Sequence, residues 1–451
     1  SSAPTSGVCG DNLTWEFDES TGTLTISGTG DMWDWDYNSH APWLQDHGYG
    51  WVNNDILKVI IEEGVTSVGD YAFESCRGIG DVKFPSTLKS IGEMAFNHNY
   101  NLKEIAFPSG LESIGDYAFF ASMNIEEINL PYGIKQIGTQ AFRDGEKIRK
   151  IIIPETATDI GYAAFTGKTA GPIGSGCDIE FGWTTNIPDK AFGGDLGEGI
   201  PELVSVIIPE GMVSIGDWAF QGCQYLESVT LPDSLLQIGN GAFNTCDRLT
   251  HIDLPDKLQV IGSGAFFFSG LTSIAIPQSV LIVGNDAFSC CGNLAIVSLP
   301  KSLSEISNNL FSGCRSLKAA TIPEKVDYVG EGAFSNCSSL KNVIFPDSVN
   351  LVCDNAFSNC NSLEKVYYSG SESSWGSISI GSGNEDLTES EIVFSKASTP
   401  DMSLGNGTDP AVTELYVVSR TPDKETVNRF DVFECEFNMP VRKPTSSEPD
   451  A

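Results

Sequence analysis

The sequence predicts a repeat solenoid built mainly of β-strands, and its regular spacing is the main reason. An Ala-Phe or Leu-Phe dipeptide recurs along the 451-residue chain, and ten of the twelve steps between copies are 22 or 23 residues. The thirteen phenylalanines are Phe73, Phe96, Phe119, Phe142, Phe165, Phe192, Phe220, Phe243, Phe266, Phe288, Phe311, Phe334 and Phe357. Prolines keep the same period from Pro85 onward, and glycines keep it from Gly69. A fixed period of about 20–50 residues indicates stacked repeats.

Each repeat has a pattern that accounts for one coil, seen most clearly in residues 226–246 as L-x-x-V-x-L-P-x-x-L-x-x-I-G-x-x-A-F-x-x-C. The apolar residues before the proline predict a short parallel strand, which proline ends because it has no N–H for the ladder. The second apolar pair returns the chain to the core, and the glycine is expected to permit a sharp corner. Ala and Phe pack inward. One coil cannot bury its own apolar face, so neighbouring coils must stack.

This unit resembles the BspA-like leucine-rich repeat of bacterial surface proteins, over about residues 56–394. The resemblance implies a right-handed, mildly curved leucine-rich-repeat solenoid with a parallel β-sheet, made of about 13 coils of 23 residues. It also implies an exported protein at the cell surface or outside the cell, with adhesion or ligand binding as its role. The family has no catalytic residues to transfer to this chain.

The segments outside the regular repeat predict the domain organisation. Residues 1–55 alternate apolar and polar around a turn, which predicts a β-hairpin that caps the first coil, as also implied by the resemblance. Residues 56–396 form the solenoid, with an insertion at 166–202 where the proline is missing and glycines are added. Residues 397–412 are rich in Ser, Thr, Pro, Gly, Asn and Asp, which predicts a linker. Residues 413–451 hold two strand-like runs, which either begin a further β-sandwich or dock on the solenoid.

Composition excludes some partners. The formal net charge of -34 excludes nucleic acid and anionic membranes as direct electrostatic partners, and it otherwise suits solubility, cation binding or a basic partner. No apolar run of 18 residues is present, so no membrane insertion is expected. Ser1-Ser2-Ala3-Pro4 is neither basic nor apolar, so we expect a mature or trimmed chain and infer export from the resemblance alone.

The twelve cysteines look at first like a disulfide set, but seven of them occupy one repeat position, three residues after the repeat phenylalanine. They are Cys76, Cys223, Cys246, Cys291, Cys314, Cys337 and Cys360. Asn99, Ser122, Gly145 and Ser269 fill the same slot elsewhere, so the slot needs a small side chain rather than a bridge. This predicts a ladder of buried free thiols. A metal ladder is the alternative, but the chain has only four His, so we expect no metal and no cofactor.

A Trp-rich segment near the N-terminus is the most conspicuous candidate site. Trp33, Trp35 and Tyr37 alternate with Asp34 and Asp36, and five of the eight tryptophans precede residue 52. Exposed aromatic rings beside carboxylates suit stacking on a sugar ring with hydrogen bonds to its hydroxyls. The same residues would equally plug the first coil. A calcium loop is excluded because its required glycine and its final glutamate are absent.

Catalytic motifs are absent. The four histidines are scattered, with no Ser or Cys motif around them. Gly167-Lys168-Thr169 resembles the end of a phosphate-binding loop, but its spacing from Gly161 is one residue too long and it follows a repeat phenylalanine rather than a strand. We interpret it as part of an inserted loop and expect no enzyme.

The outward face of the strand before each proline is the last candidate. Its side chains vary between coils, because packing constrains only the inward positions. The outward residues at one strand position include Ile152, Ile207, Ile344 and Tyr367, so this face is either a binding surface or a solvated sheet. The favoured function is therefore a non-enzymatic extracellular binding or adhesion module, expected to be a monomer, for a protein or glycan of a host or neighbouring cell. The alternative is a structural spacer, or an accessory module of a larger surface or carbohydrate-active protein.

Overall fold

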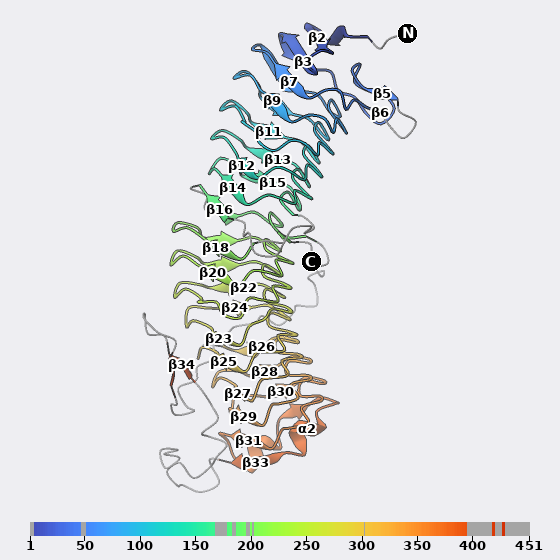
Figure 1. Cartoon of the computed structure of the whole chain (residues 1–451). Helices are drawn as coiled ribbons and strands as arrows, with labels where there is room; N and C mark the ends of the chain where they lie inside the picture. Colours follow the sequence, from blue (N-terminus) through green and yellow to red (C-terminus); the bar gives the residue numbers. More distant parts are fainter. Residues whose placement is uncertain are drawn as a thin grey trace. The chain divides into compact units, whose positions relative to one another are not determined.

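The computed structural model describes residues 4–46, 51–166, 178–182, 186–194, 199–200, 203–301, 303–394, 417–419 and 426–428. The chain divides into two compact units, Ser1–Met212 with Ala219–Leu226 and Val213–Trp218 with Glu227–Ala451. Both units consist of stacked β-coils, about fourteen turns over the described residues, which confirms the predicted β-solenoid (Figure 1). Most of the predicted insertion at 166–202 and all of the linker at 397–412 lie outside the described residues.

In unit 1, a regular coil has two strands, one before the proline and a shorter one before the repeat glycine. The long strands are β7 (Lys58–Ile61), β9 (Asp81–Lys83), β12 (Glu127–Asn129), β14 (Lys150–Ile153), β16 (Asp178–Phe181) and β18 (Ser205–Ile207). The short strands are β8 (Val65–Val68), β10 (Ser90–Ile91), β11 (Ser113–Ile114), β13 (Gln136–Ile137), β15 (Asp159–Ile160) and β17 (Asn186–Ile187). Equivalent residues of successive coils pair in parallel, as Ile91 does with Ile114. The repeat pattern had predicted only the long strand.

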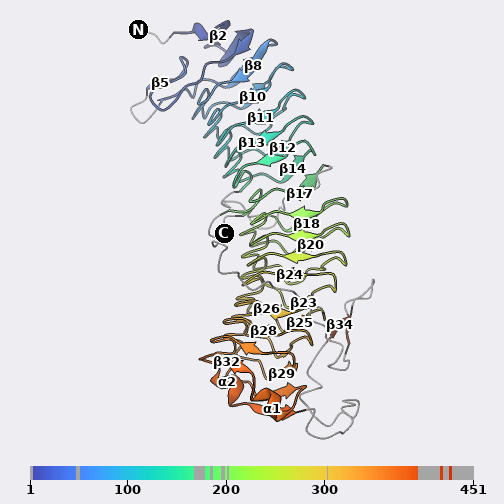
Figure 2. The same cartoon turned by 180° about the vertical axis from the view of Figure 1, so that it is seen from behind.

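The N-terminal part of unit 1 adds strands to these ladders. They are β1 (Ser6–Gly10), β2 (Leu13–Asp18), β3 (Thr23–Gly28), β4 (Gly30–Asp31), β5 (Gln45–Asp46) and β6 (Trp51–Val52). β2 and β3 form an antiparallel hairpin, and β3 then pairs in parallel with β7, so the sheet order is β1-β2-β3-β7-β9 (Figure 1). β4 joins the short-strand sheet β4-β8-β10-β11-β13-β15, part of which is labelled in Figure 2.

Unit 2 repeats this arrangement. Its long strands are β20 (Ser228–Thr230), β23 (Ser273–Ala275), β25 (Ile296–Ser298), β27 (Ala319–Thr321), β29 (Asn342–Phe345), β31 (Lys365–Tyr368) and β33 (Glu391–Phe394). Its short strands are β19 (Ser214–Ile215), β21 (Gln237–Ile238), β22 (Val260–Ile261), β24 (Ile282–Val283), β26 (Glu305–Ile306), β28 (Tyr328–Val329), β30 (Leu351–Val352) and β32 (Ser379–Ile380). Two short helices, α1 (Glu372–Trp375) and α2 (Glu385–Thr388), lie between the last strands (Figure 2). Of residues 413–451, the structure describes the antiparallel pair β34 (Val417–Ser419) and β35 (Thr426–Asn428).

The repeat phenylalanines form the core of both units. Their rings are nearly fully buried and stack face to face between successive coils, for example Phe119 on Phe142 with centroids 5.2 Å apart and planes 2° apart. The backbone follows the same step, because the N–H of Phe119 donates to the carbonyl of Ala141 in the next coil. Each coil therefore supplies one ring and one hydrogen bond to the next, which is why the Ala-Phe dipeptide recurs.

The repeat glycine has a different role from the one predicted. At Gly115 and Gly138 the backbone φ is not in the left-handed region, so these residues are not sharp corners that require glycine. A Cβ on Gly138 would instead lie 2.4 Å from the backbone of Gly115 and Asp116 in the preceding coil. The prediction of a glycine corner was wrong, because the constraint is close approach of two backbones rather than a conformation.

Left-handed backbone occurs two residues before and two residues after the repeat phenylalanine. Non-glycine residues at these positions have φ between 51° and 61°, and among them are Tyr117, Trp218 and Phe268. Gly241 and Gly332 occupy the first of these positions in other coils, also with positive φ. The coils therefore accept a conformation that usually costs about 1–2 kcal/mol per non-glycine residue.

Polar side chains form two further ladders between coils. After the repeat glycine, the Oδ1 atom of Asp116 accepts the backbone N–H of Thr139 in the next coil at 2.7 Å, and Asp217 and Asn308 make equivalent bonds.

In the predicted thiol slot, Sγ of Cys314 donates to the carbonyl of Phe288 at 3.2 Å. The side chains of Asn99 and Ser122 do the same in their coils, as do the thiols of Cys223, Cys291, Cys337 and Cys360. The slot therefore selects a small hydrogen-bond donor.

All seven slot cysteines are buried and free, which confirms the predicted ladder of free thiols. Burial raises the pKa of the Cys76 and Cys223 thiols to about 12, because the thiolate would lose its solvation. Thiols with such pKa values are unreactive at neutral pH.

Side chains replace the missing neighbouring coil at the ends of the two units. At the start of unit 1, the ring of Trp43 stacks on Phe73 at 5.3 Å, and its Nε1 donates to the carbonyl of Ala72 at 2.8 Å. A repeat phenylalanine would supply the same ring and the same N–H. At the end of unit 2, Oδ1 of Asn384 accepts the N–H of Phe357 at 2.9 Å. Each cap thus satisfies backbone groups that a solenoid end would leave open.

Candidate binding sites

The Trp-rich segment is used largely for packing and for shaping the first coil. Trp35 packs edge-on against Trp43 at 5.4 Å. The carboxylate of Asp34 accepts the N–H of Asp70 at 3.0 Å, which is the same inter-coil bond that the repeat aspartates make. Residues 33–34 therefore imitate the corner of a regular coil.

Two members of the predicted aromatic site remain accessible. Trp33 is 43% exposed, and its Nε1 donates to the carboxylate of Asp11 at 3.1 Å. Tyr37 is 83% exposed and lies within the turn that the Asp36 carboxylate stabilises by accepting the N–H groups of Asn38 and Ser39. Trp35 is half-buried against Trp43, so the three predicted residues do not present one continuous aromatic face.

The outward positions of the long strands lie in register, as the strand alternation predicts. In unit 1, Ile152 pairs with Asn129 on one side and Glu180 on the other. β18 lies beside β16, and its Ile207 is 69% exposed. Ile152 is only half-buried rather than exposed, because neighbouring strands cover part of its side chain.

Charged groups flank this outward position in unit 1. Lys150, two residues before Ile152 on the same strand face, forms a 2.7 Å ion pair with Glu180. Lys58 and Asp81 form a similar 2.7 Å pair between β7 and β9. We call the outward side chains of β7, β9, β12, β14, β16 and β18 the long-strand face. It combines isolated aliphatic side chains with surface ion pairs.

Unit 2 carries the two other predicted residues of this position. Ile344 pairs with Thr321 and with Tyr367, and Tyr367 pairs in turn with Val393. All four side chains are half-buried, so Ile344 is also less exposed than the alternation alone predicts. Ile344 and Tyr367 are therefore direct neighbours, whereas Ile152 has Asn129 and Glu180 as its paired neighbours.

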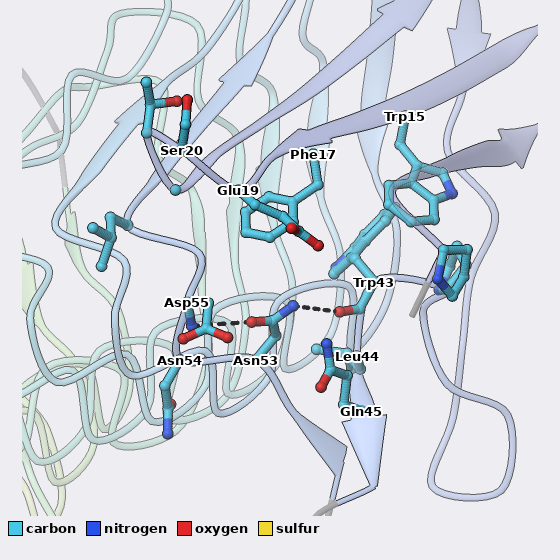
Figure 3. A pocket seen from close by; sticks show the side chains of 15 residues that line it. Trp15, Phe17, Glu19, Ser20, Trp43, Leu44, Gln45, Asn53, Asn54 and Asp55 are labelled. Carbon is cyan, nitrogen blue, oxygen red and sulfur yellow. Dashed lines mark hydrogen bonds between the residues drawn. The ribbon is translucent and has the colours of Figure 1, made fainter. Parts of the chain in front are cut away.

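A pocket in the N-terminal part of unit 1 was not predicted. It has a volume of about 560 Å³, is open on one side, and is bordered by the β2–β3 turn, residues 42–45 and residues 53–57 (Figure 3). We call it the cap pocket. Its lining includes the rings of Trp15, Phe17 and Trp43, with Trp15 and Trp43 almost fully buried and Phe17 half-buried.

Hydrogen bonds hold the three walls of the cap pocket in place. The carboxylate of Asp18 accepts the N–H and the hydroxyl of Ser20, at 2.9 and 2.6 Å, which holds the pKa of Asp18 below its usual value. The carbonyl of Gly22 accepts the N–H of Leu57 at 2.8 Å. The buried amide of Asn53 donates to the carbonyl of Trp43 at 2.8 Å and accepts the N–H of residue 55 at 3.0 Å. The walls are therefore tied to one another before any ligand arrives.

Four polar side chains of the cap pocket have no such structural task, and one of them is Asn54, next to Asp55. Within the described part of the chain, the side chains of Glu19, Gln45 and Asp55 form no hydrogen bond or ion pair. Figure 3 shows Glu19 on the side of the β2–β3 turn, and Gln45 and Asp55 on the other walls. The described lining contains no Lys or Arg.

The sequence did not predict this pocket, because its residues come from three separated segments. Phe17 ends the inward alternation of β2 and could have been recognised as a core position left partly open. Glu19 and Asp55 carry no local signal, since carboxylates are frequent in this chain. Among the described residues, no group of three or more His, Cys, Asp and Glu could hold a metal ion. The same residues include no helix long and apolar enough to cross a membrane.

Comparison with known proteins agrees with the stacked coils. A family model described as "BspA type Leucine rich repeat region" matches residues 49–170, 185–318 and 259–381, in six copies. The chain is similar to a leucine-rich repeat protein from Bacteroides ovatus, with 22% identity, 86% of this chain and 99% of that chain covered, and a TM-score of 0.55.

Two further solved structures are similar to parts or most of the chain. A leucine-rich repeat protein of T. pallidum is 35% identical over 37% of this chain and 79% of its own, with a TM-score of 0.34. A leucine-rich cell surface protein from Faecalibacterium prausnitzii is 22% identical, with 83% and 98% covered and a TM-score of 0.43. No curated protein matched the chain.

Proposed function

Because the chain belongs to the BspA-type leucine-rich repeat family, whose model matches most of it, we propose that it is a non-catalytic, extracellular protein-binding module. The long-strand face of unit 1 is its binding surface. The ligand is a protein of a host or neighbouring cell. Proteins of this family are repeat proteins of bacterial surfaces, and leucine-rich repeat domains generally mediate protein interactions.

One observation carries the choice of surface. The inward residues of the long strands are nearly invariant in type, whereas the outward residue changes from Lys83 to Asn129, Ile152, Glu180 and Ile207. Packing explains the inward residues and leaves the outward ones free. An isoleucine that is 69% exposed at position 207 contributes nothing to the core, yet it offers apolar area to a partner. Aliphatic contacts ringed by polar groups are typical of protein interfaces.

The proposal is tested with a panel of immobilised extracellular matrix proteins and a glycan array, probed with the full chain. We expect saturable binding to a protein of the panel that Ile207→Lys and Ile152→Lys each weaken at least about tenfold, since a buried lysine charge would be left unpaired. The matched control is Leu281→Lys, which adds the same charge at a 49% exposed position off this face.

Three outcomes would contradict the proposal. Equal weakening by Leu281→Lys would indicate a general charge effect rather than a contact. Binding that the two isoleucine variants leave unchanged would exclude the long-strand face. No binding to any probe would favour the alternative function, a structural spacer or accessory module.

A further inference from the structure

We propose that the cap pocket is a second binding site, separate from the long-strand face, and that it takes one sugar unit of a glycan. The proposal goes beyond the protein-binding function and does not depend on it. It rests on the shape of the pocket, on its unpaired polar groups and on the rigidity of its walls.

The size and lining of the cap pocket suit a small ligand. Its volume of about 560 Å³ lies within the usual range for small-molecule sites, about 300–1,000 Å³. The partly open ring of Phe17 and the 53% exposed side chain of Leu57 provide apolar area on its surface. The buried rings of Trp15 and Trp43 form the base beneath. Such sites combine an apolar surface with a few polar groups that orient the ligand.

The polar groups determine the class of ligand. Glu19, Gln45 and Asp55 come from three different walls, and their side chains form no hydrogen bond or ion pair with another described residue. Two of them are carboxylates, so they accept hydrogen bonds, while the amide of Gln45 both donates and accepts. A ligand that donates on several sides matches this arrangement. A sugar ring carries hydroxyls around its edge and apolar C–H groups on its faces, so it can use the acceptors and the Phe17 ring together.

Other ligand classes fit less well. An anion would meet two carboxylates and no basic side chain in the described lining. A purely apolar ligand would remove both carboxylates from water without a partner, which is costly. An alkylammonium group would be attracted by the two charges, but it donates from a single point, whereas the acceptors stand on separate walls of a much larger hollow.

The walls are ordered before the ligand binds, which favours recognition of a small ligand that makes few contacts. Asp18 fixes the turn that carries Glu19, through hydrogen bonds from Ser20 and Thr21. Asn53 connects the segment that carries Asp55 to the backbone of Trp43. Preformed walls reduce the entropy that binding would otherwise cost.

The experiment uses the full chain and a panel of free D-glucose, D-galactose, D-mannose and N-acetyl-D-glucosamine. Binding is followed by saturation-transfer NMR and by tryptophan fluorescence, because Trp15 and Trp43 line the pocket. We expect saturable binding of at least one sugar, with a dissociation constant on the order of millimolar. Glu19→Ala and Gln45→Ala should each weaken it about tenfold or more, since each removes hydrogen bonds made in the pocket.

The matched control is Glu16→Ala. Glu16 lies between the lining residues Trp15 and Phe17 but is exposed on the opposite face of β2, so this variant removes a nearby carboxylate that does not line the pocket. Nα-acetyl-L-lysine amide serves as the cationic probe. The replaced side chains are not buried, so circular dichroism is expected to show the same fold in all variants.

Each contrary outcome overturns the proposal. These outcomes are no saturable binding of any sugar in the panel at tens of millimolar, or equal loss of binding in Glu16→Ala. Tighter binding of the lysine derivative than of any sugar, abolished by Asp55→Asn, would reassign the pocket to a cationic ligand. Failure of the protein panel on the long-strand face has no bearing on these results, because the two sets of variants share no residue.

Discussion

Trp43 and Trp33 lie in the same cap, and replacing each by alanine should give opposite results. Trp43 is 3% exposed, stacks on Phe73 at 5.3 Å, contacts Trp15 and Trp35 edge-on, and donates to the carbonyl of Ala72. Removing a buried aromatic side chain costs about 3–5 kcal/mol, including the cavity it leaves. The carbonyl of Ala72 also loses its donor, which adds about 1 kcal/mol.

Trp33→Ala removes a side chain that is 43% exposed, together with one hydrogen bond to the exposed Asp11. We expect a cost of about 1 kcal/mol or less, typical of surface substitutions with one polar contact. The two variants therefore differ by about 3–5 kcal/mol although they delete the same atoms. The contrast separates a role in capping from a role on the surface.

Hydrogen exchange measured by mass spectrometry is the suitable assay, because coils of a repeat protein can open locally. We expect Trp43→Ala to reduce protection in residues 70–98, the corners of the first two regular coils, by two orders of magnitude or more (about 3 kcal/mol). Trp33→Ala should change it less than about tenfold. If Trp33→Ala reduced protection as much as Trp43→Ala, the assignment of Trp43 as the end of the phenylalanine stack would be wrong.

Three further predictions concern the repeat itself. Cys314→Ser should be more stable than Cys314→Ala by about 1 kcal/mol in urea denaturation, because serine can still donate to Phe288; the reverse order would mean that the slot selects apolar character. Gln140→Gly should leave the stability of the protein unchanged or raise it by up to about 1 kcal/mol, because φ is 53° at this position. Gln136→Gly, on the short strand β13, should lower the stability by about the same amount. Equal losses of stability in thermal denaturation would contradict the role of the left-handed corner. Burial raises the pKa of the Cys223 thiol from 9 to about 12, so the free energy that the protonated thiol contributes to folding is fully present below pH 9. This contribution is lost as the pH rises towards 12, by about 1.4 kcal/mol per pH unit. Urea denaturation at pH 8 and pH 10 should therefore show a smaller loss of unfolding free energy in Cys223→Ser than in the unmodified protein.

Much of the fold follows from the period alone. A residue that recurs every 23 positions must occupy the same place in every coil, so the stacking of Phe119 on Phe142 could be predicted without coordinates. The same reasoning placed seven cysteines at equivalent positions of successive coils and predicted free thiols rather than disulfides. It also placed Ile344 and Tyr367 at equivalent strand positions, which pair directly.

Contacts between coils were harder to predict. The reason for Gly138 lies in the preceding coil, 2.4 Å from where its Cβ would stand, and no local conformation reveals it. The hydrogen bonds of Asp116 and Asn308 to the next coil have a sequence signal, an Asp or Asn that recurs after or near the repeat glycine, but the acidic composition concealed it. Part of that acidity is thus structural.

The candidate sites were the least predictable part. Composition alone favoured Trp33, Trp35 and Tyr37 as a site, but only the packing shows that Trp43 takes the place of a repeat phenylalanine. The cap pocket depends on three segments whose order along the chain says nothing about their distance.

The length of the coil, its inward residues, its thiol column and its stacking all follow from the repeated sequence. The reason is that each repeat packs against the next in the same way and therefore keeps the same residue types at the same positions. The tertiary structure alone decided what happens where the repetition stops. At the cap, one indole replaces both the ring and the N–H of a missing coil, and Glu19, Gln45 and Asp55 face one hollow with no partner among the described residues. Each of these residues occurs once, so no periodicity predicts its role. That role depends on which residues the folded cap places around it.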